Sequence, residues 1–332
     1  MSDTLLSIED LEVRFRGEEG ETAPVKGVCL KVRAGETTAL VGESGSGKSV
    51  TSLAVMGLLP RPSGRVARGR MMFRRAGGEA IDLAALTPKA MRALRGNEIA
   101  MVFQEPMTSL NPVLSIGEQI AEQVREHMGL NARAAMKRAE EMLGLVEIPD
   151  ARRRAGDYPH QISGGMRQRV MIALAMSCNP RLLIADEPTT ALDVTIQAQI
   201  LALIDRLRRE HGMGVLFVTH NLGVVAEVAS TVTVMYAGEV VESADVKTLF
   251  RNPRHPYTRA LMDCLPARAA RGTDGRRRVN SIQGTVASAL AMMLGCKFAP
   301  RCASAQEACR ATAPMLEQTE TQSIRCLRWR EI

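Results

Sequence analysis

A short glycine-rich stretch carries the strongest chemical signal in this sequence. It reads GESGSGKS and consists of Gly42, Glu43, Ser44, Gly45, Ser46, Gly47, Lys48 and Ser49. Glycines let a backbone pass close to an anion, and the N–H groups that open a following helix favour negative charge. In the pattern G-x-x-x-x-G-K-S/T the lysine reaches the outer phosphates of a nucleotide, and the final hydroxyl binds Mg²⁺. The stretch therefore predicts a nucleotide phosphate site between a strand over 37–41 and a helix.

Polar residues that could act on such a nucleotide stand at the ends of three apolar runs. RLLIADE ends in Asp186 and Glu187, EIAMVFQ ends in Gln104, and GVLFVT is followed by His220. Asp186 can hold Mg²⁺, and Glu187 can polarise an attacking water. Two adjacent acids at the end of a strand are rarely structural, because it is costly to desolvate them without a cation. Gln104 could touch the metal or the water, and His220 could donate to a γ-phosphate oxygen. Taken alone, a single Gln is more often a solvated surface residue, and a single His is more often a structural residue whose hydrogen bonds are satisfied.

Two further features suggest contacts with a nucleotide. Ser163, Gly164 and Gly165 open a helix, and the same amide and dipole physics makes this a second anion site. One bound nucleotide does not need two such sites, so the second would serve another molecule in a dimer with composite sites. Phe15 precedes the glycine-rich stretch in a chain with few aromatics, and its ring could stack on adenine. The alternatives are a simple helix cap at Ser163 and a core position for Phe15.

Composition indicates an ordinary soluble globular protein. The 332 residues are 45% hydrophobic and 24% charged, which suits about two domains. No apolar run reaches the length of a membrane span, and the acidic N-terminus is not a secretory signal, so a cytoplasmic location is expected. The net charge of +7 suits an anionic surface such as nucleic acid or lipid headgroups, or a solvated arginine-rich exterior.

The order of the apolar runs predicts an α/β architecture. Strands alternate with helices from residue 37 to 220, which gives a mainly parallel sheet with ligands at the carboxyl ends of its strands. Residues 5–13 and 27–32 alternate as two strands of a small antiparallel sheet, and residues 71–73 and 81–83 are predicted to be a hairpin or paired edge strands. Residues 116–148 have helical periodicity and form a helical insert.

Four of the seven cysteines gather near the C-terminus, at Cys296, Cys302, Cys309 and Cys326. Clustered cysteines in a cytoplasmic chain favour a metal site, and thiolate-only ligation suits an Fe–S cluster or Zn²⁺. The spacing lacks the C-x2-C pairs of a zinc ribbon. Reduced structural thiols are the alternative here, and they are the preferred interpretation of the three other cysteines.

Taken together, GESGSGKS, the Gln104 strand, ISGGM, LLIADEP, ALD and VTH resemble the ATP-binding subunits of ABC transporters over about residues 5–245. The resemblance implies a P-loop ABC-type nucleotide-binding domain at 1–250, with a helical subdomain at about 105–165, and an extension at 251–332. Met166 stands where the commonest signature has Gln, as is typical of peptide importers. The site roles implied by the resemblance are Phe15 on adenine; Lys48 on phosphates; Ser49, Gln104 and Asp186 around Mg²⁺; Glu187 as catalytic base; His220 as γ-phosphate sensor; Ser163–Gly165 on ATP held by a partner; and Asp193 as a link between the two ATP sites.

Two tail segments point to one branch of this family. NPRHPYTRALMDCLP and GCKFAPRCASAQEAC are similar to the C-terminal extension of dipeptide, oligopeptide and nickel importer ATPases. This likeness implies a [4Fe–4S] cluster on the four clustered cysteines, with Zn²⁺ as the alternative. The chain departs from the branch at 282–294, where family members carry prolines and this sequence has none. The arginine-rich residues 267–280 before it are predicted to be an exposed linker.

The sequence thus predicts an ATPase that powers import of di- or oligopeptides. Implied partners are a related ATPase subunit, two membrane permease subunits and an extracytoplasmic solute-binding protein, with the chain on the cytoplasmic face of the inner membrane. Alternatives are import of nickel or another small solute, a soluble ABC ATPase acting on nucleic acid, and a regulatory binding module. The absence of a coiled-coil insert or second cassette argues against the nucleic-acid ATPase, and Glu187 with His220 argues against the regulatory module.

Overall fold

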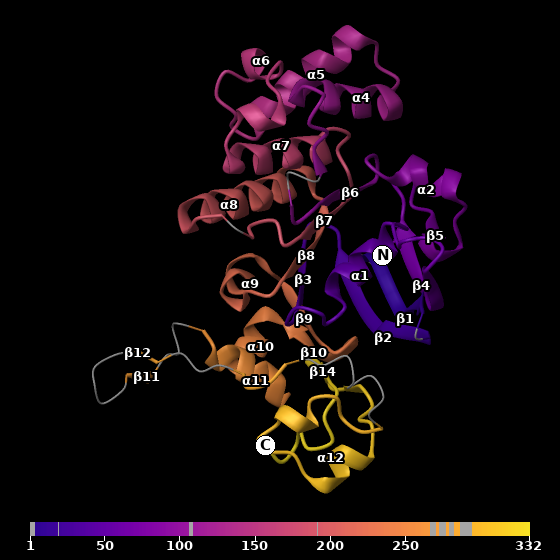
Figure 1. Cartoon of the computed structure of the whole chain (residues 1–332), viewed down its shortest axis with the longest axis vertical. Helices are drawn as coiled ribbons and strands as arrows, with labels where there is room; N and C mark the ends of the chain where they lie inside the picture. The colour runs from indigo at the N-terminus through magenta and orange to yellow at the C-terminus, as the bar shows by residue number, and fades with distance from the viewer. Residues whose placement is uncertain are drawn as a thin grey trace. The chain divides into compact units, whose positions relative to one another are not determined.

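The computed structural model describes residues 4–18, 20–105, 109–190, 192–265, 270–271, 277–278, 282–285 and 294–332. The chain divides into two compact units, each built from segments that are far apart in the sequence (Figure 1). Unit 1 comprises Met1–Leu6, Val32–Glu36 and Met72–Phe217, and unit 2 comprises Ser7–Lys31, Thr37–Met71 and Val218–Ile332.

Unit 1 contains three neighbouring strands in the order β8-β7-β6. β6 (Ile99–Val102) and β7 (Leu182–Asp186) pair in parallel, with Ile99 opposite Leu182. Every residue of β7 and of β8 (Gly214–Thr219) is buried, as in a sheet covered on both faces. The two apolar runs predicted as buried strands are therefore confirmed.

Helices make up most of the rest of unit 1. They are η1 (Leu83–Ala85), α2 (Pro88–Leu94), α4 (Ile116–Met128), α5 (Ala132–Leu145), α6 (Ala151–Arg154), η2 (Pro159–Gln161), α7 (Gly164–Met176) and α8 (Val194–His211). The predicted helical insert is confirmed as α4 and α5, which pack against each other and on α7 (Figure 1). Gly129 ends α4 with a left-handed φ of 64°, and the side chain of Asn131 caps the start of α5.

In unit 2, five neighbouring strands have the order β13-β14-β10-β9-β3. β3 (Thr37–Val41) and β9 (Thr231–Tyr236) pair in parallel, and β9 pairs antiparallel with β10 (Glu239–Asp245). β14 (Gln322–Ile324) pairs antiparallel with β10 and with β13 (Glu317–Gln318). The C-terminal segment thus adds two strands to the sheet that contains β3.

The helices of unit 2 are α1 (Lys48–Val55), α9 (Leu222–Val228), α10 (Val246–Arg251), α11 (Pro256–Asp263), η5 (Ala299–Arg301) and α12 (Glu307–Ala311). Three aromatic rings form the centre of their core: Tyr236 of β9 lies 4.7 Å from Tyr257 of α11 and 5.2 Å from Phe298, between ring centroids. Such aromatic pairs add to the stability gained from burial. β11 (Ala270–Arg271) and β12 (Arg277–Arg278) form a short antiparallel pair, and most of the predicted 267–294 linker lies outside the described residues.

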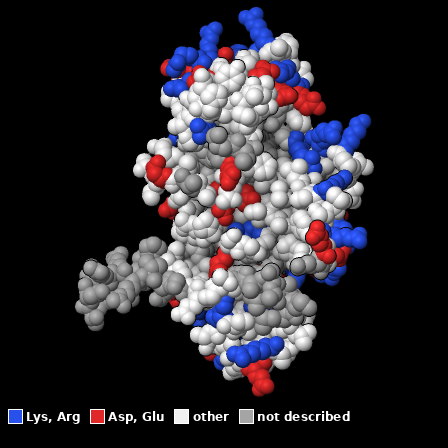
Figure 2. Space-filling view, viewed as in Figure 1, with Lys and Arg blue, Asp and Glu red and all other residues white. Residues whose placement is uncertain are grey.

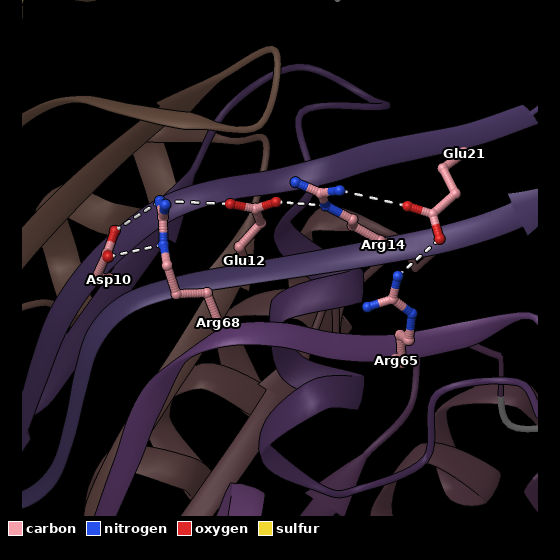
Figure 3. A network of polar contacts seen from close by, with 6 residues as sticks. All are labelled: Asp10, Glu12, Arg14, Glu21, Arg65 and Arg68. Carbon is pink, nitrogen blue, oxygen red and sulfur yellow. Dashed lines mark hydrogen bonds and ion pairs between the residues drawn. The ribbon is translucent and has the colours of Figure 1, made fainter.

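The small antiparallel sheet also matches its prediction. Its strands β1 (Thr4–Gly17), β2 (Gly20–Arg33) and β4 (Gly64–Arg74) lie in the order β2-β1-β4, and in unit 1 the end of β4 pairs antiparallel with β5 (Ala80–Asp82). On the unit 2 part of this sheet, ion pairs join a row of charged side chains into one network (Figure 3). We call these residues the sheet network: Asp10, Glu12, Arg14, Glu21, Arg65 and Arg68.

The basic net charge is not gathered into one region of the visible surface. On the face drawn in Figure 2, Lys and Arg side chains are interspersed with Asp and Glu side chains. The sheet network is one such mixture, since three arginines there contact three carboxylates. This distribution fits the prediction of a solvated arginine-rich exterior.

Candidate nucleotide-binding site

The predicted phosphate loop lies in unit 2 between β3 and α1, with Gly47 as the last residue before the helix. Gly47 has a φ of 99°, and a Cβ there would lie 2.4 Å from the carbonyl oxygen of Pro24. A Cβ on Gly42 would lie 2.2 Å from the carbonyl oxygen of Met235. Both contacts are with backbone atoms and cannot be relieved by rotating a side chain, so the loop conformation requires glycine at these two positions.

The start of α1 suits an anion. No side chain caps this helix and no acidic residue stands in its first turn, so the positive end of its dipole has no neighbouring carboxylate there. The Ser46 Oγ atom is buried and has no hydrogen-bond partner in the described part of the chain. A buried hydroxyl without a partner beside a positive helix end is a combination that a phosphate group would satisfy.

Lys48 begins α1 and is 5% exposed. Its Nζ donates to the carbonyl oxygen of Gly42 at 2.8 Å and to that of Glu43 at 3.0 Å. These two carbonyls therefore fix the ammonium group within the loop, where a nucleotide phosphate would compete for its hydrogen bonds.

Glu43 is held by the C-terminal part of unit 2, which the sequence did not indicate. Its backbone N–H donates to Tyr257 Oη at 2.9 Å, and its carboxylate accepts from Arg301 Nη1 at 3.0 and 3.2 Å. Burial raises the pKa of Tyr257 above its usual value, so its hydroxyl stays neutral. Burial lowers the pKa of Arg301, but hydrogen bonds with Tyr236 and Glu43 raise it more, and the guanidinium remains charged.

The predicted catalytic residues Gln104, Asp186 and Glu187 lie in unit 1. Asp186 ends β7 and is 6% exposed, and Glu187 follows it with a left-handed φ of 47°. Glu187 Oε2 accepts from Gln104 Nε2 at 3.3 Å and from Thr190 Oγ1 at 2.9 Å. A non-glycine residue in this backbone region is uncommon, and such strain clusters at functional sites. Thr190 was missed by the sequence analysis, although its hydroxyl three residues after Glu187 was a usable signal.

The predicted second anion site lies at the start of α7 in unit 1. Ser163 caps this helix, because its Oγ accepts from the Met166 N–H at 3.3 Å. Asp193 caps α8 in the same way, with its Oδ1 accepting from the Ile196 N–H at 2.9 Å. A Cβ on Gly165 would lie 3.1 Å from the side chain of Ile196, so a glycine there lets the two helix starts approach closely.

Phe15 and His220 also belong to unit 2. Phe15 is half-buried in β1, and a Cβ on Gly64 would lie 2.8 Å from its ring. His220 is exposed directly after β8. Within unit 1, the structure thus brings the side chains of Gln104 and Glu187 into contact.

The four clustered cysteines line one small cavity of unit 2. Its volume is about 20 Å³, and its walls include His255, Phe298 and the thiols of Cys296, Cys302, Cys309 and Cys326. Burial raises the pKa of Cys296 to about 11 and raises the pKa of Cys302 and Cys326, with smaller contributions from the neighbouring thiols. A cavity of this size holds about one water molecule. Within the described residues, no three His, Cys, Asp or Glu side chains converge closely enough to hold a metal ion.

A wide groove lies in unit 1 beside α2 and α4. Its volume is about 800 Å³, and most of its lining is polar or charged. Its charged lining residues are Arg92, Arg95, Glu122, Arg125 and Glu126. Among the described helices, none combines the length and apolar character needed to cross a membrane.

Comparisons with known proteins agree with this geometry. A family model described as ABC transporter matches residues 25–190, and one described as the C-terminal region of oligopeptide/dipeptide transporters matches residues 241–309. A putative peptide import ATP-binding protein of Brucella abortus is 57% identical over 99% of this chain and 98% of its own length. The glutathione import ATP-binding protein GsiA of Escherichia coli is 53% identical over 82% of this chain and 44% of its own length.

Solved structures show the same fold. The dimeric ATP-binding cassette MJ0796, in a post-hydrolysis state bound to ADP and Pi, aligns with a TM-score of 0.64 and 28% identity. The alignment covers 73% of this chain and 99% of that cassette. The cbiO1 protein of Clostridium perfringens, part of the ABC transporter complex cbiONQ, aligns with a TM-score of 0.62 and 27% identity over 76% of this chain and 92% of its own.

Proposed function

Because this chain belongs to the ABC transporter family of ATP-binding proteins, we propose that it hydrolyses ATP to power import of di- or oligopeptides. The observation that carries the proposal is the pairing of two matches, one to the ATP-binding cassette and one to the oligopeptide/dipeptide C-terminal region. Relatives of nearly equal length that are named for peptide import support the same substrate class. Import of nickel or another small solute is the alternative.

The phosphate loop binds the nucleotide. Backbone N–H groups at the start of α1 and the ammonium of Lys48 neutralise the phosphates, and positioning with charge stabilisation supplies most of the catalysis of phosphoryl transfer. Ser49, Gln104 and Asp186 would hold Mg²⁺, which neutralises charge on the outer phosphates when bound. Phe15 would stack on the adenine.

Glu187 orients the attacking water and accepts its proton. Hydrogen bonds from Gln104 and Thr190 to the same carboxylate oxygen hold that side chain in one orientation, which is what a positioned base requires. His220 would donate to the γ-phosphate. These roles rest on residue type and on the contacts within each unit.

The second anion site would serve ATP held by a related partner ATPase. The amides of Gly164 and Gly165 open α7, and Asp193 opens the helix that packs beside it. The dimeric cassette among the similar structures supports an arrangement of two ATPase subunits. Asp193 would connect the two nucleotide sites through the contact between α7 and α8.

The groove beside α2 and α4 would receive a permease subunit. The groove borders the helical insert that follows Gln104, so a movement of the catalytic residues would shift a permease helix docked there. Its arginines and glutamates suit a partner segment with charges of both signs. The chain would then lie peripherally on the cytoplasmic face of the inner membrane, against two permease subunits that receive solute from a binding protein.

We also propose that the four clustered cysteines hold a [4Fe–4S] cluster, with Zn²⁺ as the alternative. All four thiols line one cavity, and a set of four thiolates is the usual ligand set of such clusters. The donor set fits in kind, while a cavity of about 20 Å³ has to widen to admit the group. A bound cluster would supply a redox-active centre. Iron and zinc analysis of anaerobically purified protein tests this, and absence of both metals would contradict it.

Replacement of Glu187 by Gln tests the catalytic assignment. ATP hydrolysis by the Glu187→Gln variant should fall by about 10²- to 10⁴-fold while ATP binding is retained, because a general base contributes on that scale. Glu141→Gln is the matched control, since the ion pairs of Glu141 among the described residues are with Lys137 and Arg138 of its own helix. Turnover near that of the parent would remove Glu187 from the mechanism.

The substrate class is tested in cells. Uptake of a radiolabelled dipeptide should be lost when the chain is replaced by its Glu187→Gln variant, while uptake of Ni²⁺ is unchanged. The reverse result would support the nickel alternative. Loss of neither would overturn the proposal that this chain powers peptide import.

A further inference from the structure

We propose that Arg301 is a positioning residue for the phosphate loop and that the C-terminal segment thereby sets the affinity for MgATP. This inference rests on the proposed ATP binding and adds to it a residue far from the loop in the sequence. Arg301 acts through Glu43, whose carbonyl oxygen is one of the two that hold Lys48 Nζ. All these residues belong to unit 2.

Arg301 is held more firmly than an ordinary surface arginine. Its side chain is 6% exposed, and Nη1 lies 3.0 Å from Glu43 Oε2 and 3.3 Å from Tyr236 Oη. Its Nε donates to the carbonyl oxygen of Gln283 at 2.8 Å, and Nη2 donates to that of Ile282 at 3.3 Å. Each nitrogen of the guanidinium is therefore engaged, and the group has one defined position.

Glu43 connects three parts of unit 2 through three different groups. Its carboxylate accepts from Arg301, its N–H donates to Tyr257 Oη at 2.9 Å, and its carbonyl accepts from Lys48 Nζ at 3.0 Å. A shift of Glu43 would change both the path of the loop and the site of the ammonium group. The affinity for phosphate therefore depends on contacts made by residues beyond the nucleotide-binding motifs.

The neighbours of Arg301 tie this contact to the cysteine cavity. Arg301 directly precedes Cys302, and Phe298, on the same short segment, packs on Tyr236 and Tyr257. Tyr257 in turn holds the N–H of Glu43. The segment that carries Cys296 and Cys302 thus contacts the phosphate loop directly through Arg301, and through Phe298 it packs on the tyrosine that holds the Glu43 N–H.

The test measures MgATP binding to the full chain. Arg301→Gln should raise the Kd and the KM for MgATP about tenfold, the scale of one charge-assisted hydrogen bond, with kcat per folded molecule within about twofold of the parent. Arg301→Lys should recover only part of the affinity, because an ammonium cannot reproduce the several fixed hydrogen bonds of the guanidinium. The double variant Glu43→Gln/Arg301→Gln should bind no more weakly than the weaker single variant, since both changes break one contact.

Arg330→Gln is the matched control. Arg330 Nη2 lies 3.0 Å from Glu317 Oε2, the distance found in the Arg301–Glu43 pair, but its side chain is 73% exposed. Its replacement should leave MgATP affinity unchanged. Tyr257→Phe is a second variant for the case in which Arg301→Gln does not fold, and loss of its hydroxyl should weaken binding through the Glu43 N–H.

Three outcomes would overturn the inference. Parental Kd in folded Arg301→Gln or Tyr257→Phe protein would show that these residues only stabilise the fold. Additive effects of the Glu43 and Arg301 changes on binding would show that the two side chains act separately. Absence of MgATP binding by the parent would overturn the proposed function, and this inference with it, whereas a binding parent with unaffected variants overturns this inference alone.

Discussion

Two groups of arginine–carboxylate contacts in unit 2 have similar geometry and very different surroundings. In the sheet network, Arg65 lies 2.7 Å from Glu21 and Arg68 lies 2.8 Å from Asp10, with both arginine side chains more than half exposed (Figure 3). Arg301 lies 3.0 Å from Glu43, and its side chain is 6% exposed. The nitrogen–oxygen distances are similar in the two groups, but the solvent exposure of the arginine side chains differs.

The difference matters because solvent screens the first group much more than the second. Exposed ion pairs contribute little to stability, since the charges are nearly as well solvated apart as together. A buried charge that loses its partner is left without either water or a counter-charge, so breaking the pair is costly. The comparison also has a functional side, because Glu43 belongs to the phosphate loop whereas the sheet network lies on strands of the small sheet.

The largest expected effect comes from removing the partner of the buried arginine. Glu43→Gln should lower the free energy of unfolding by about 3 kcal/mol, the low end of the range for a broken buried pair, because Glu43 remains partly exposed. Urea unfolding of the full chain measures it. Glu317→Gln, which removes the partner of exposed Arg330, is the control and should have a much smaller effect. Equal effects of the two changes would mean that burial does not distinguish the pairs.

A pH titration sharpens the comparison through the opposite behaviour of two glutamates. Burial raises the pKa of Glu242, which accepts from the N–H groups of Arg254 and His255, whereas hydrogen bonds from Arg65 and Arg14 lower the pKa of Glu21. A raised pKa means that the folded state binds more protons, so the Glu242 contribution to stability is lost as pH rises from 4.5 through the raised value. The lowered pKa of Glu21 has the opposite effect: its contribution to stability is present above pH 4.5 and is lost as the pH falls through the lowered value.

The measurement compares unfolding of the parent with that of Glu242→Gln between pH 4 and pH 8. Parent stability relative to the variant should decrease with rising pH, by at most about 1.4 kcal/mol per pH unit. The Glu21→Gln variant serves as the control, because at low ionic strength its small stability difference from the parent should change with pH in the opposite direction. A parent-minus-variant difference for Glu242 that increases with pH would contradict the burial argument.

The smallest effect is expected in the sheet network itself. Glu21→Gln removes the carboxylate shared by Arg14 and Arg65, but all three side chains are well exposed. Unfolding at moderate ionic strength should be hard to distinguish from that of the parent, and any difference at low salt should disappear when salt is added. A large, salt-independent loss of stability would show that the network is a structural core of the sheet.

Sequence reasoning located the parts of the site that depend on local pattern. Gly47 and Lys48 belong to a motif of eight residues, and Glu187 follows an apolar run that is typical of a buried strand. The Arg301–Glu43 contact joins residues 258 positions apart, and neither residue has a local feature that selects the other. The cysteine spacing identified four thiols, but their convergence on one cavity depends on how 294–332 folds against Tyr257.

The same limit applies to the sheet. β3, β7 and β8 are continuous apolar strands and were recognisable from composition. β14 is only Gln322–Ile324, with two polar residues of three, and its place beside β10 comes from pairing across a long stretch of chain. Short polar strands carry no periodic signal, so their pairing has to be seen in the fold.

The separation of Arg301 from Glu43 has a consequence for biosynthesis. A ribosome that adds roughly 5–20 residues per second releases the phosphate loop about 10–50 s before it makes the arginine that pairs with it. For most of that interval the nascent loop lacks both Tyr257 and Arg301, and the edge of β10 lacks β14. The nucleotide site can therefore reach its final form only after Arg301 has been made, which delays high-affinity ATP binding until the segment that carries this arginine has been translated.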